Sequence, residues 1–337
     1  MKLNEKYSKY ALVREMMETA DVVRNFKTDD LKNVAAAIKQ TGKLFFTGEG
    51  SSRIFPAKNT MYSAMRAGCE ICMATDGSRQ AAEYDLTKYT VFGASNSGST
   101  KEVITLLDRL GKVGHKNIFG LTAREDTILA KYARQTFVLK CGWENAVAAT
   151  KSVAEQALFY NELLACLQGR TLAGKLPQLA DAVKAALTTD INPDITKAIS
   201  GAGTIYFAGR NDGVAEELTL KTNEITRKKS DYLEGTYAVH GIEEVMNPED
   251  VVIVINPYKA EEDKFQKVLV EGVGMKVIAI SDEDTLFPTI KVPAVGELQN
   301  YVYLAAGWNI LVEVGLNIGI NLDKPVRARK VGNEYEG

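Results

Sequence analysis

The sequence predicts an α/β protein built from two doubly wound units, each with a parallel sheet that has helices on both faces. Short apolar runs such as 43–48 and 251–257 alternate with segments of helical periodicity, which is typical of such sheets. The alternation occurs twice, from about residue 43 and again from about residue 195, without a repeated sequence at a fixed period. A length of 337 residues also fits roughly two domains of about 150 residues each.

The first unit follows two predicted helices, one over 9–24 and one that starts at a Thr28-Asp29-Asp30 cap and runs through Ile38. Strands and helices then alternate as far as a helical linker that ends at Leu187. We expect strands at 43–48, 69–75, 90–95, 117–123 and 136–140, and helices ending at Arg66, over 101–113, near 127–133 and ending near Gln168.

The second unit repeats this order from about residue 195. We expect strands at 203–210, 251–257 and 276–281, and helices at 212–229, 262–273 and 298–318. The predicted domains are an N-terminal helical extension (1–34), a first domain (35–190) and a second domain with a C-terminal tail (191–337).

The composition limits the partners of the protein. Apolar residues make up 45% and charged residues 25%, as in ordinary globular proteins, and the net charge of -2 gives no electrostatic attraction for nucleic acid or an anionic membrane. No apolar run approaches the ~18 residues of a membrane span, and the N-terminal residues lack the apolar core of a signal peptide. We therefore expect a cytoplasmic protein.

The sequence offers no motif for a metal or a cofactor. Cys69 and Cys72 form a C-x-x-C without a second pair, and the alternating pattern around them predicts that both thiols fill a strand's core. Gly48-Glu49-Gly50 supplies only half of a dinucleotide-binding fingerprint, and no complete Walker A loop is present. We expect no cofactor, and this argues against a dehydrogenase.

The clearest functional signal lies in residues 90–104. An apolar run ends at Ser95-Asn96-Ser97-Gly98-Ser99-Thr100, and a helical pattern begins immediately behind it. Such a turn directs backbone N–H groups, hydroxyls and the positive end of a helix dipole at one point, which suits a phosphate monoester. Gly98 can adopt a positive φ there. The alternative is that the hydroxyls merely cap the helix.

A second turn of the same kind, Gly50-Ser51-Ser52, follows the strand at 43–48. Ligands of parallel sheets bind beyond the carboxyl ends of the strands, near a switch in strand order. We therefore expect both turns to hold one phosphate, and the loop with Val147, Thr150 and Lys151 to close the pocket from the side.

Three residues, His240, Lys221 and Glu224, could act as acids, bases or their partners. We expect His115, in a turn, to be exposed and uninvolved, whereas His240 follows a β-rich run and is either an acid or base or a structural residue. Lys221 and Glu224 lie on one face of a helix, where a surface ion pair is the commoner reading. Apolar neighbours would instead desolvate Glu224 and raise its pKa toward that of a useful base.

Taken in order, these motifs resemble the double sugar-isomerase (SIS) domain family, which includes the isomerase half of glucosamine-6-phosphate synthase and related isomerases, deaminases and deglycases. The resemblance covers roughly residues 35–335 and implies two flavodoxin-like domains. The segments that carry it are Gly50-Ser51-Ser52, Ser95 to Thr100, Val147-Ala148-Ala149-Thr150-Lys151, the Lys221 and Glu224 pair, His240-Gly241, and Lys330 near the end of the chain.

The resemblance also implies roles for these residues. Glu224 would move a proton between C1 and C2 of an open-chain sugar, His240 would assist ring opening, and Lys221 and Lys330 would contact sugar hydroxyls or stabilise the enediol-like intermediate. The residues implied to bind the sugar phosphate are Gly50, Ser51, Ser52, Ser95, Asn96, Ser97, Thr100, Val147 and Ala149. Because the histidine can come from a neighbouring subunit in this family, a homodimer or a higher homo-oligomer with shared active sites is implied.

We expect a phosphosugar isomerase or an amino-sugar-phosphate deaminase that acts on a ketose or aldose 6-phosphate. A fructosamine-6-phosphate-type deglycase and a non-catalytic phosphosugar-binding protein remain alternatives. Three departures from the family pattern bear on the substrate: Ala149 replaces a frequent serine, Ile242 replaces the proline of the usual H-G-P, and Glu49 lies in the first phosphate loop.

Overall fold

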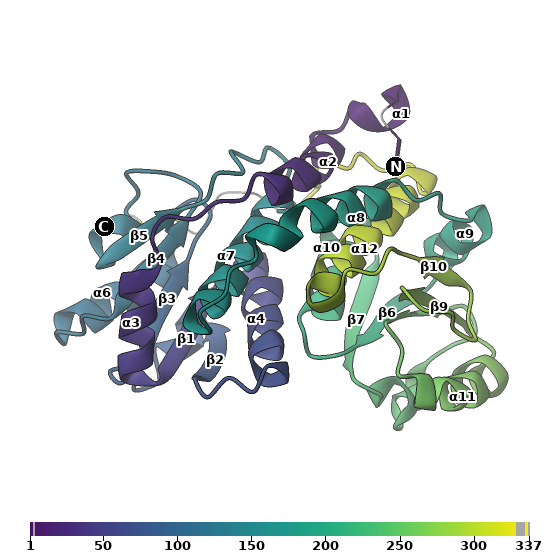
Figure 1. The fold of residues 1–337 in the computed structure, drawn as a ribbon. Coiled ribbons are helices and arrows are strands. Elements are labelled where there is room, and N and C mark those ends of the chain that lie inside the picture. The colour runs from purple at the N-terminus through teal and green to yellow at the C-terminus, as the bar shows by residue number, and fades with distance from the viewer. Residues whose placement is uncertain (3, 328–333, 336–337) are drawn as a thin grey trace. The chain divides into compact units, whose positions relative to one another are not determined.

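Two five-stranded parallel sheets carry the fold, and each belongs to its own compact unit (Figure 1). The computed structural model describes residues 1–2, 4–327 and 334–335. Of these, the sheet-1 unit holds the described residues of 21–144, 149–177 and 334–335, and the sheet-2 unit holds those of 1–20, 145–148 and 178–327. The domain boundaries drawn from the sequence stay a prediction.

The strands run in parallel within both sheets. They are β1 (Lys43–Gly48), β2 (Cys72–Gly77), β3 (Thr90–Ala94), β4 (Ile118–Thr122), β5 (Gln135–Val138), β6 (Thr204–Gly209), β7 (Lys229–Glu234), β8 (Val251–Ile255), β9 (Lys276–Ser281) and β10 (Thr289–Lys291). The first sheet has the order β2-β1-β3-β4-β5 and the second β10-β9-β8-β6-β7. Both orders are doubly wound, with a switch beside the first strand of the unit, so the predicted fold class is confirmed.

Helices connect the strands and cover the sheets. In chain order they are α1 (Glu5–Ser8), α2 (Ala11–Arg24), α3 (Lys32–Thr41), α4 (Ile54–Arg66), α5 (Ser78–Ala81), α6 (Lys101–Lys112), α7 (Lys151–Leu167), α8 (Leu176–Thr188), α9 (Pro193–Gly201), α10 (Val214–Thr226), α11 (Glu262–Phe265) and α12 (Gln299–Asn317). In the described part of the chain, no helix combines the length and apolar character that a membrane crossing needs.

An aromatic cluster forms the core of the sheet-1 unit. The ring of Phe92 in β3 lies 5.6 Å from that of Phe119 in β4 and 6.0 Å from that of Phe137 in β5. Phe159 and Tyr160 of α7 approach the same ring at 5.7 and 5.5 Å. Such contacts between offset or tilted rings stabilise a core beyond the area they bury.

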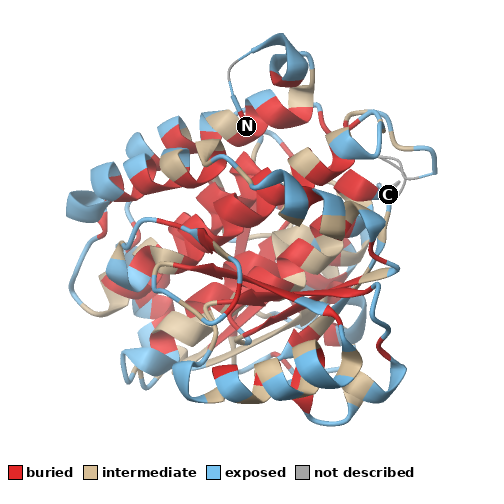
Figure 2. Ribbon diagram, turned by 90° about the vertical axis from the view of Figure 1, so that its right-hand side faces the viewer, coloured by how far each residue is buried: buried red, intermediate tan, exposed pale blue. Residues whose placement is uncertain are grey.

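The sheet-2 unit is built around α12 and the central strands. Helix α12 is buried along almost all of its length, as are β8 and β9, which Figure 2 shows in red. Asn309 on α12 is fully buried, and its amide nitrogen donates to the carbonyls of Ala186 and Thr189 at 3.1 and 2.8 Å. A buried polar side chain of this kind needs such partners to avoid a desolvation cost.

Five helices and strands were absent from the sequence-based prediction: the four-residue helices α1 and α5, strands β7 and β10, and helix α9. Strand β7 reads Lys-Ser-Asp-Tyr-Leu-Glu at a sheet edge, and β10 has three residues, so neither shows an apolar run. Helix α9 begins with Pro193 and takes its cap from Asn192, whose side chain accepts from the N–H of Asp194 at 2.8 Å. That start signal was present in the sequence.

Two predicted helices have a different form. The segment 127–133 contains only a 3-10 turn at Leu129–Lys131. The helix predicted over 262–273 is α-helical in α11 and continues as a π-helix over Gln266–Val273. Apolar periodicity does not distinguish these helix types, since their side-chain spacing is close.

Local details bear on three expectations and overturn two of them. Helix α3 begins at Lys32 with Leu31 as its N-cap residue, and within the predicted Thr28-Asp29-Asp30 cap it is Asp30 that accepts the N–H of Lys32, at 3.0 Å. Cys72 is exposed because β2 is an edge strand, so the expected core position is wrong for this thiol. His115 is half-buried rather than exposed, and burial lowers its pKa.

Candidate functional site

The Ser95–Thr100 turn joins β3 to α6 in the sheet-1 unit. Ser95 Oγ lies 2.7 Å from Thr100 Oγ1, and Ser99 Oγ donates to Ser97 Oγ at 2.9 Å, so the hydroxyls gather at the start of the helix. Thr100 is the N-cap residue, but its side chain makes no capping hydrogen bond within the described structure. The plain capping alternative therefore does not account for this hydroxyl, and the first turn of α6 can serve an anion.

Glycine is required inside this turn. Gly98 has a φ of +68°, and a Cβ there would lie 2.3 Å from the side chain of Thr127. Both observations exclude an ordinary side chain, so the predicted positive φ at Gly98 is confirmed. On the other side of the turn, Tyr335 donates its N–H to the carbonyl of Ser99 at 2.9 Å. Lys330, a predicted site residue, lies outside the described residues.

The Gly50–Ser52 turn lies beside the first one. It follows β1, which pairs directly with β3, so both turns begin at the carboxyl ends of neighbouring strands. A Cβ on Gly48 would lie 3.0 Å from the carbonyl oxygens of Ala94 and Ser52, which shows how closely the two strand ends approach. The sheet-1 unit thus brings together the two predicted phosphate turns at the switch in strand order.

The carboxylate of Glu49 has a structural partner. Its Oε1 accepts the N–H of Ser78 at 2.9 Å, at the start of α5. Gln156 of α7 donates to the carbonyl of Ser52 and so holds the last residue of the turn. Glu49 is therefore part of the support of the turn.

A buried carboxylate shapes the loop that precedes α7. Glu144 is fully buried and accepts the N–H and the hydroxyl of Thr150 at 2.7 and 3.0 Å, as well as the hydroxyl of Ser152. These bonds fix the chain directly after Ala149, which is half-buried. Glu144 could not be identified from the sequence, because its role depends on burial that no local pattern signals.

In the sheet-2 unit, α10 carries a cluster of three charges. Lys221 Nζ lies 2.7 Å from Glu224 Oε2 and 3.4 Å from Glu217 Oε1. The side chains of Lys221 and Glu217 are fully buried, whereas Glu224 keeps 25% of its side chain exposed. The reading as a surface ion pair is therefore wrong, and the buried ammonium orients the one carboxylate that reaches a pocket.

That pocket has a volume of about 560 Å³ and lies at the carboxyl end of α10. Glu224 lines it together with Val147, so two of the predicted site residues meet there. Glu15 holds the segment of Val147 by accepting the N–H groups of Asn145 and Ala146. The rest of the lining is Asn223, Arg227, Lys228, Lys229, Pro325, Val326 and Arg327.

His240 lies in a different part of the same unit. Its exposed side chain follows the 3-10 turn Tyr237–Val239, and its Nε2 is 3.2 Å from Lys264 Nζ. An ammonium can only donate, so in this contact the ring nitrogen that faces Lys264 is the acceptor. Lys264 was not singled out from the sequence.

One chain does not bring Glu224 and His240 together. Helix α10 starts after the carboxyl end of β6 and returns to the amino end of β7, so Glu224 lies near the amino ends of the strands. His240 follows the carboxyl end of β7. Since a six-residue strand spans about 20 Å, the two side chains lie at opposite ends of this sheet.

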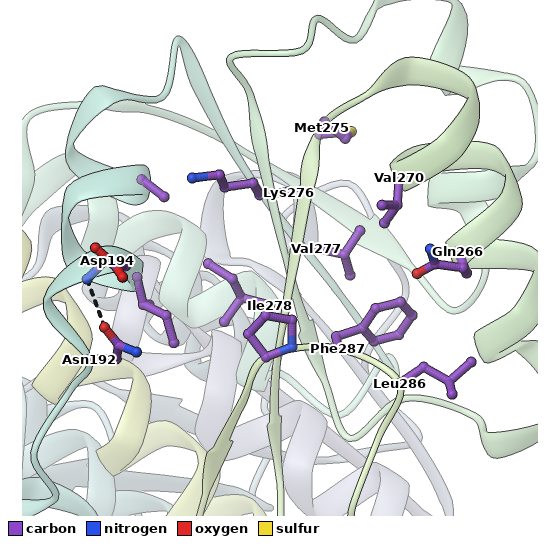
Figure 3. A pocket seen from close by; sticks show the side chains of 13 residues that line it. Asn192, Asp194, Gln266, Val270, Met275, Lys276, Val277, Ile278, Leu286 and Phe287 are labelled. Carbon is purple, nitrogen blue, oxygen red and sulfur yellow. Dashed lines mark hydrogen bonds between the residues drawn. The ribbon is translucent and has the colours of Figure 1, made fainter.

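A second pocket of the sheet-2 unit is apolar (Figure 3). It measures about 410 Å³ and lies between α9, β9 and the π-helix, with Val270, Val277 and Phe287 on its walls. Asp194 and Lys276 are its charged residues, and none of the described residues predicted for the site lines it.

Solved structures of sugar-phosphate proteins share this fold. The C-terminal domain of glucosamine-fructose-6-phosphate aminotransferase from Francisella tularensis matches with a TM-score of 0.79 and 18% identity, over 96% of this chain and 100% of that one. Tagatose-6-phosphate ketose/aldose isomerase from Escherichia coli matches with a TM-score of 0.78 and 17% identity, over 96% and 99% of the two chains.

A glucosamine-6-phosphate deaminase from Thermotoga maritima also matches, with a TM-score of 0.72 and 20% identity over 95% of this chain and 98% of that one. No protein-family model and no curated protein matches the sequence. At these identities the solved structures show a common fold. The chain therefore has, over nearly its whole length, the two-sheet fold of these solved structures, which confirms at the level of the fold the resemblance noted in the sequence.

Proposed function

We propose that this protein binds a sugar phosphate and transfers a proton between C1 and C2 of an open-chain ketose or aldose 6-phosphate, as a phosphosugar isomerase or an amino-sugar-phosphate deaminase. The observation that carries the proposal is the Glu224 carboxylate, which a buried ammonium orients on the wall of a pocket. The solved structures with this fold include an isomerase and a deaminase of sugar phosphates, which supports the same reaction class.

The chemistry requires two kinds of group. A proton on a carbon beside a carbonyl or an imine is weakly acidic, so its removal needs a positioned base and stabilisation of the charge that develops on the neighbouring oxygen or nitrogen. Glu224 is the proposed base. Lys221 is fully buried between two carboxylates, so we assign it to the positioning of Glu224 rather than to the sugar hydroxyls.

The phosphate is assigned to the sheet-1 unit. Ser95, Ser97 and Thr100 place hydroxyls at the first turn of α6, and the neighbouring turn adds Ser51 and Ser52. Hydroxyls and backbone N–H groups at a helix N-terminus bind a phosphate dianion without an added metal ion.

A homo-oligomer with shared active sites is part of the proposal. Glu224 and His240 of one chain lie at opposite ends of the second sheet, so a site that uses both takes them from two chains. This arrangement has a quantitative test. Glu224→Gln and His240→Asn variants are each inactive alone, but their mixture, after subunit exchange, regains about a quarter of the wild-type activity for a symmetric dimer. No recovery in a mixture with proven exchange contradicts the sharing.

The binding step is tested by thermal denaturation with hexose 6-phosphates, amino-hexose 6-phosphates, and the same sugars without phosphate. A ligand at a hundredfold excess over its Kd stabilises the fold by about 2.7 kcal/mol, which raises the midpoint visibly. We expect a shift with one phosphorylated class, and its loss in the Ser97→Ala/Thr100→Ala double variant. A shift that survives in this variant contradicts the assigned phosphate turn, and no shift with any sugar contradicts the function.

A further inference from the structure

The core of the sheet-2 unit holds His240 and Lys264 next to each other. His240 directly follows Val239, which is 3% exposed. Lys264 directly precedes Phe265, which is 4% exposed, and the two apolar side chains belong to one hydrophobic cluster. Because close packing fixes the buried residues, it also fixes the backbone that carries the two polar side chains. This packing brings Lys264 Nζ to 3.2 Å from His240 Nε2.

The chain is also anchored directly after the histidine. Gly241 has a φ of +107°, which turns the backbone at this point, and its N–H donates to Glu243 Oε2 at 2.6 Å. Ile242, which replaces the proline of the usual H-G-P, packs against the same hydrophobic cluster. The backbone is thus held on both sides of His240, while the imidazole ring stays exposed.

The contact decides which ring nitrogen His240 presents to a ligand. Lys264 Nζ donates to Nε2, so in the neutral ring the proton lies on Nδ1. Within the described part of the chain, Nδ1 has no hydrogen-bond partner, and Lys264 forms no ion pair within 4.0 Å. The nitrogen that is left for a ligand is therefore an N–H donor.

The proposed reaction needs such a donor before a proton can move between C1 and C2. A ketose 6-phosphate in water is mainly a five-membered hemiketal ring, which has to open to form the C2 carbonyl. Opening breaks the bond between C2 and the ring oxygen O5, and O5 must receive a proton as it leaves. A neutral imidazole that gave up its Nδ1 proton would become an anion unless a proton reached Nε2 at the same time.

We propose that Lys264 is a positioning residue for His240: it holds the ring with its proton on Nδ1, and it passes a proton to Nε2 when Nδ1 protonates the ring oxygen of the sugar phosphate. The inference rests on the proposed function, in which His240 belongs to the shared active site.

This ring opening balances without a cofactor. The C2–O5 bond breaks, O5 takes the electron pair and the Nδ1 proton, and Nε2 takes a proton from Nζ. The hydroxyl on C2 loses its proton to water as the C2=O bond forms, and water returns a proton to the amine of Lys264. Nothing is oxidised or reduced.

The first readout is the nitrogen NMR spectrum of the imidazole rings at about pH 8.5, where an imidazole is neutral. The chain has two histidines, so the signals that disappear in His240→Asn are those of His240. We expect the proton on Nδ1 in the wild type. Lys264→Met has no donor and should shift the ring toward the Nε2–H form that a free imidazole prefers in water, whereas Lys264→Arg can still donate and should keep the Nδ1–H form.

Lys267→Met is the matched control, because this exposed lysine follows Lys264 by three residues and has no hydrogen bond to His240 within the described structure. It should leave the spectrum unchanged. A wild-type His240 with its proton on Nε2, or a spectrum that Lys264→Met does not alter, overturns the proposal whatever the substrate is.

The second readout is deuterium exchange at C1 in D2O, with fructose 6-phosphate and with 5-deoxyfructose 6-phosphate, which lacks the hydroxyl that closes the ring. With fructose 6-phosphate we expect Lys264→Met and Lys264→Arg to lower kcat at least about tenfold with little change in KM, since methionine has no proton to give and a guanidinium does not release one. With the open-chain analogue, both variants should stay within about twofold of the wild type.

The two readouts separate the possible failures. Equal losses on the two sugars overturn the role in ring opening, and a Lys264→Arg variant with the wild-type rate overturns the proton transfer from Lys264. If the wild type exchanges neither sugar, the proposed proton transfer at C1 and C2 fails, and the role in ring opening fails with it. The NMR spectrum still decides in that case whether Lys264 sets the tautomer of His240.

Discussion

Replacement of Lys221 by methionine tests the buried charge cluster of α10 most sharply. Lys221 is fully buried, 3.4 Å from the equally buried Glu217 and 2.7 Å from Glu224. Methionine has a similar length but no charge, so the variant leaves the carboxylate of Glu217 in the interior without this ammonium. Removal of one partner from a buried ion pair costs about 3–5 kcal/mol of unfolding free energy.

The double variant Glu217→Gln/Lys221→Met gives the decisive comparison. It removes both charges at nearly constant volume, and such replacements are close to neutral or even stabilising. We therefore expect the double variant to be more stable than Lys221→Met alone by about 2 kcal/mol or more, which is a large coupling for two residues in contact. Glu224→Gln should cost less than about 1 kcal/mol, since this carboxylate remains partly in water.

The assay is equilibrium unfolding in urea at pH 7, with the midpoint and slope of each variant fitted separately. Thermal midpoints should fall by about 2–4 °C for each kcal/mol lost. The reasoning is refuted if Lys221→Met lowers the free energy of unfolding by less than about 1 kcal/mol. It is also refuted if the loss in the double variant equals the sum of the losses measured for Lys221→Met and Glu217→Gln alone.

Three further predictions concern stability and the Ser95–Thr100 turn. Burial raises the pKa of Asp212 to about 6, so the native state holds this proton more tightly than the unfolded chain, and the free energy of unfolding should fall as pH rises from about 4 to 6. Asp212→Asn can still accept the N–H of Val214, and it should make the urea midpoint less dependent on pH in this window. If the urea midpoint of the variant depends on pH as steeply as that of the wild type, the assignment to Asp212 is contradicted. Phe92→Ala removes the centre of the aromatic cluster and should lower the urea-derived unfolding free energy by about 3–5 kcal/mol, whereas a loss under about 1 kcal/mol would mean that the core collapses into the space. Gly98→Ala should destabilise the fold and weaken sugar-phosphate binding in the thermal-shift assay, and adding Thr127→Ala should recover part of the stability; no recovery would mean that the positive φ alone sets the cost.

Much of the fold and both hydroxyl-rich turns could be predicted because their signals are local. A turn such as Ser95–Thr100 combines a preceding apolar run, a glycine with positive φ and a following helix, all within about a dozen residues. Edge strands lack such signals. Strand β7 alternates polar and apolar residues, and its pairing with β6 decides its structure.

The burial of the charge cluster on α10 and the position of His240 could not be predicted, because both depend on how segments distant in the sequence pack together. Glu217 and Lys221 are buried because α10 packs between β6 and α12, and α12 lies more than seventy residues later in the chain. Glu224 and His240 are sixteen residues apart in the sequence, a separation that by itself would allow the two side chains to lie close together. The chain instead reverses after α10 and runs the length of β7, which separates the two side chains.

The role of Glu224 is the central claim, and proton exchange at carbon tests it most directly. The wild type and Glu224→Gln are incubated in D2O with the sugar phosphate that stabilises the fold, and deuterium at C1 and C2 is followed by NMR. Glu271→Gln, an exposed carboxylate of the same unit, serves as the control. The account predicts exchange by the wild type and the control, and a rate about 10²–10⁴ lower in Glu224→Gln with binding retained. Exchange at the wild-type rate in Glu224→Gln would contradict it.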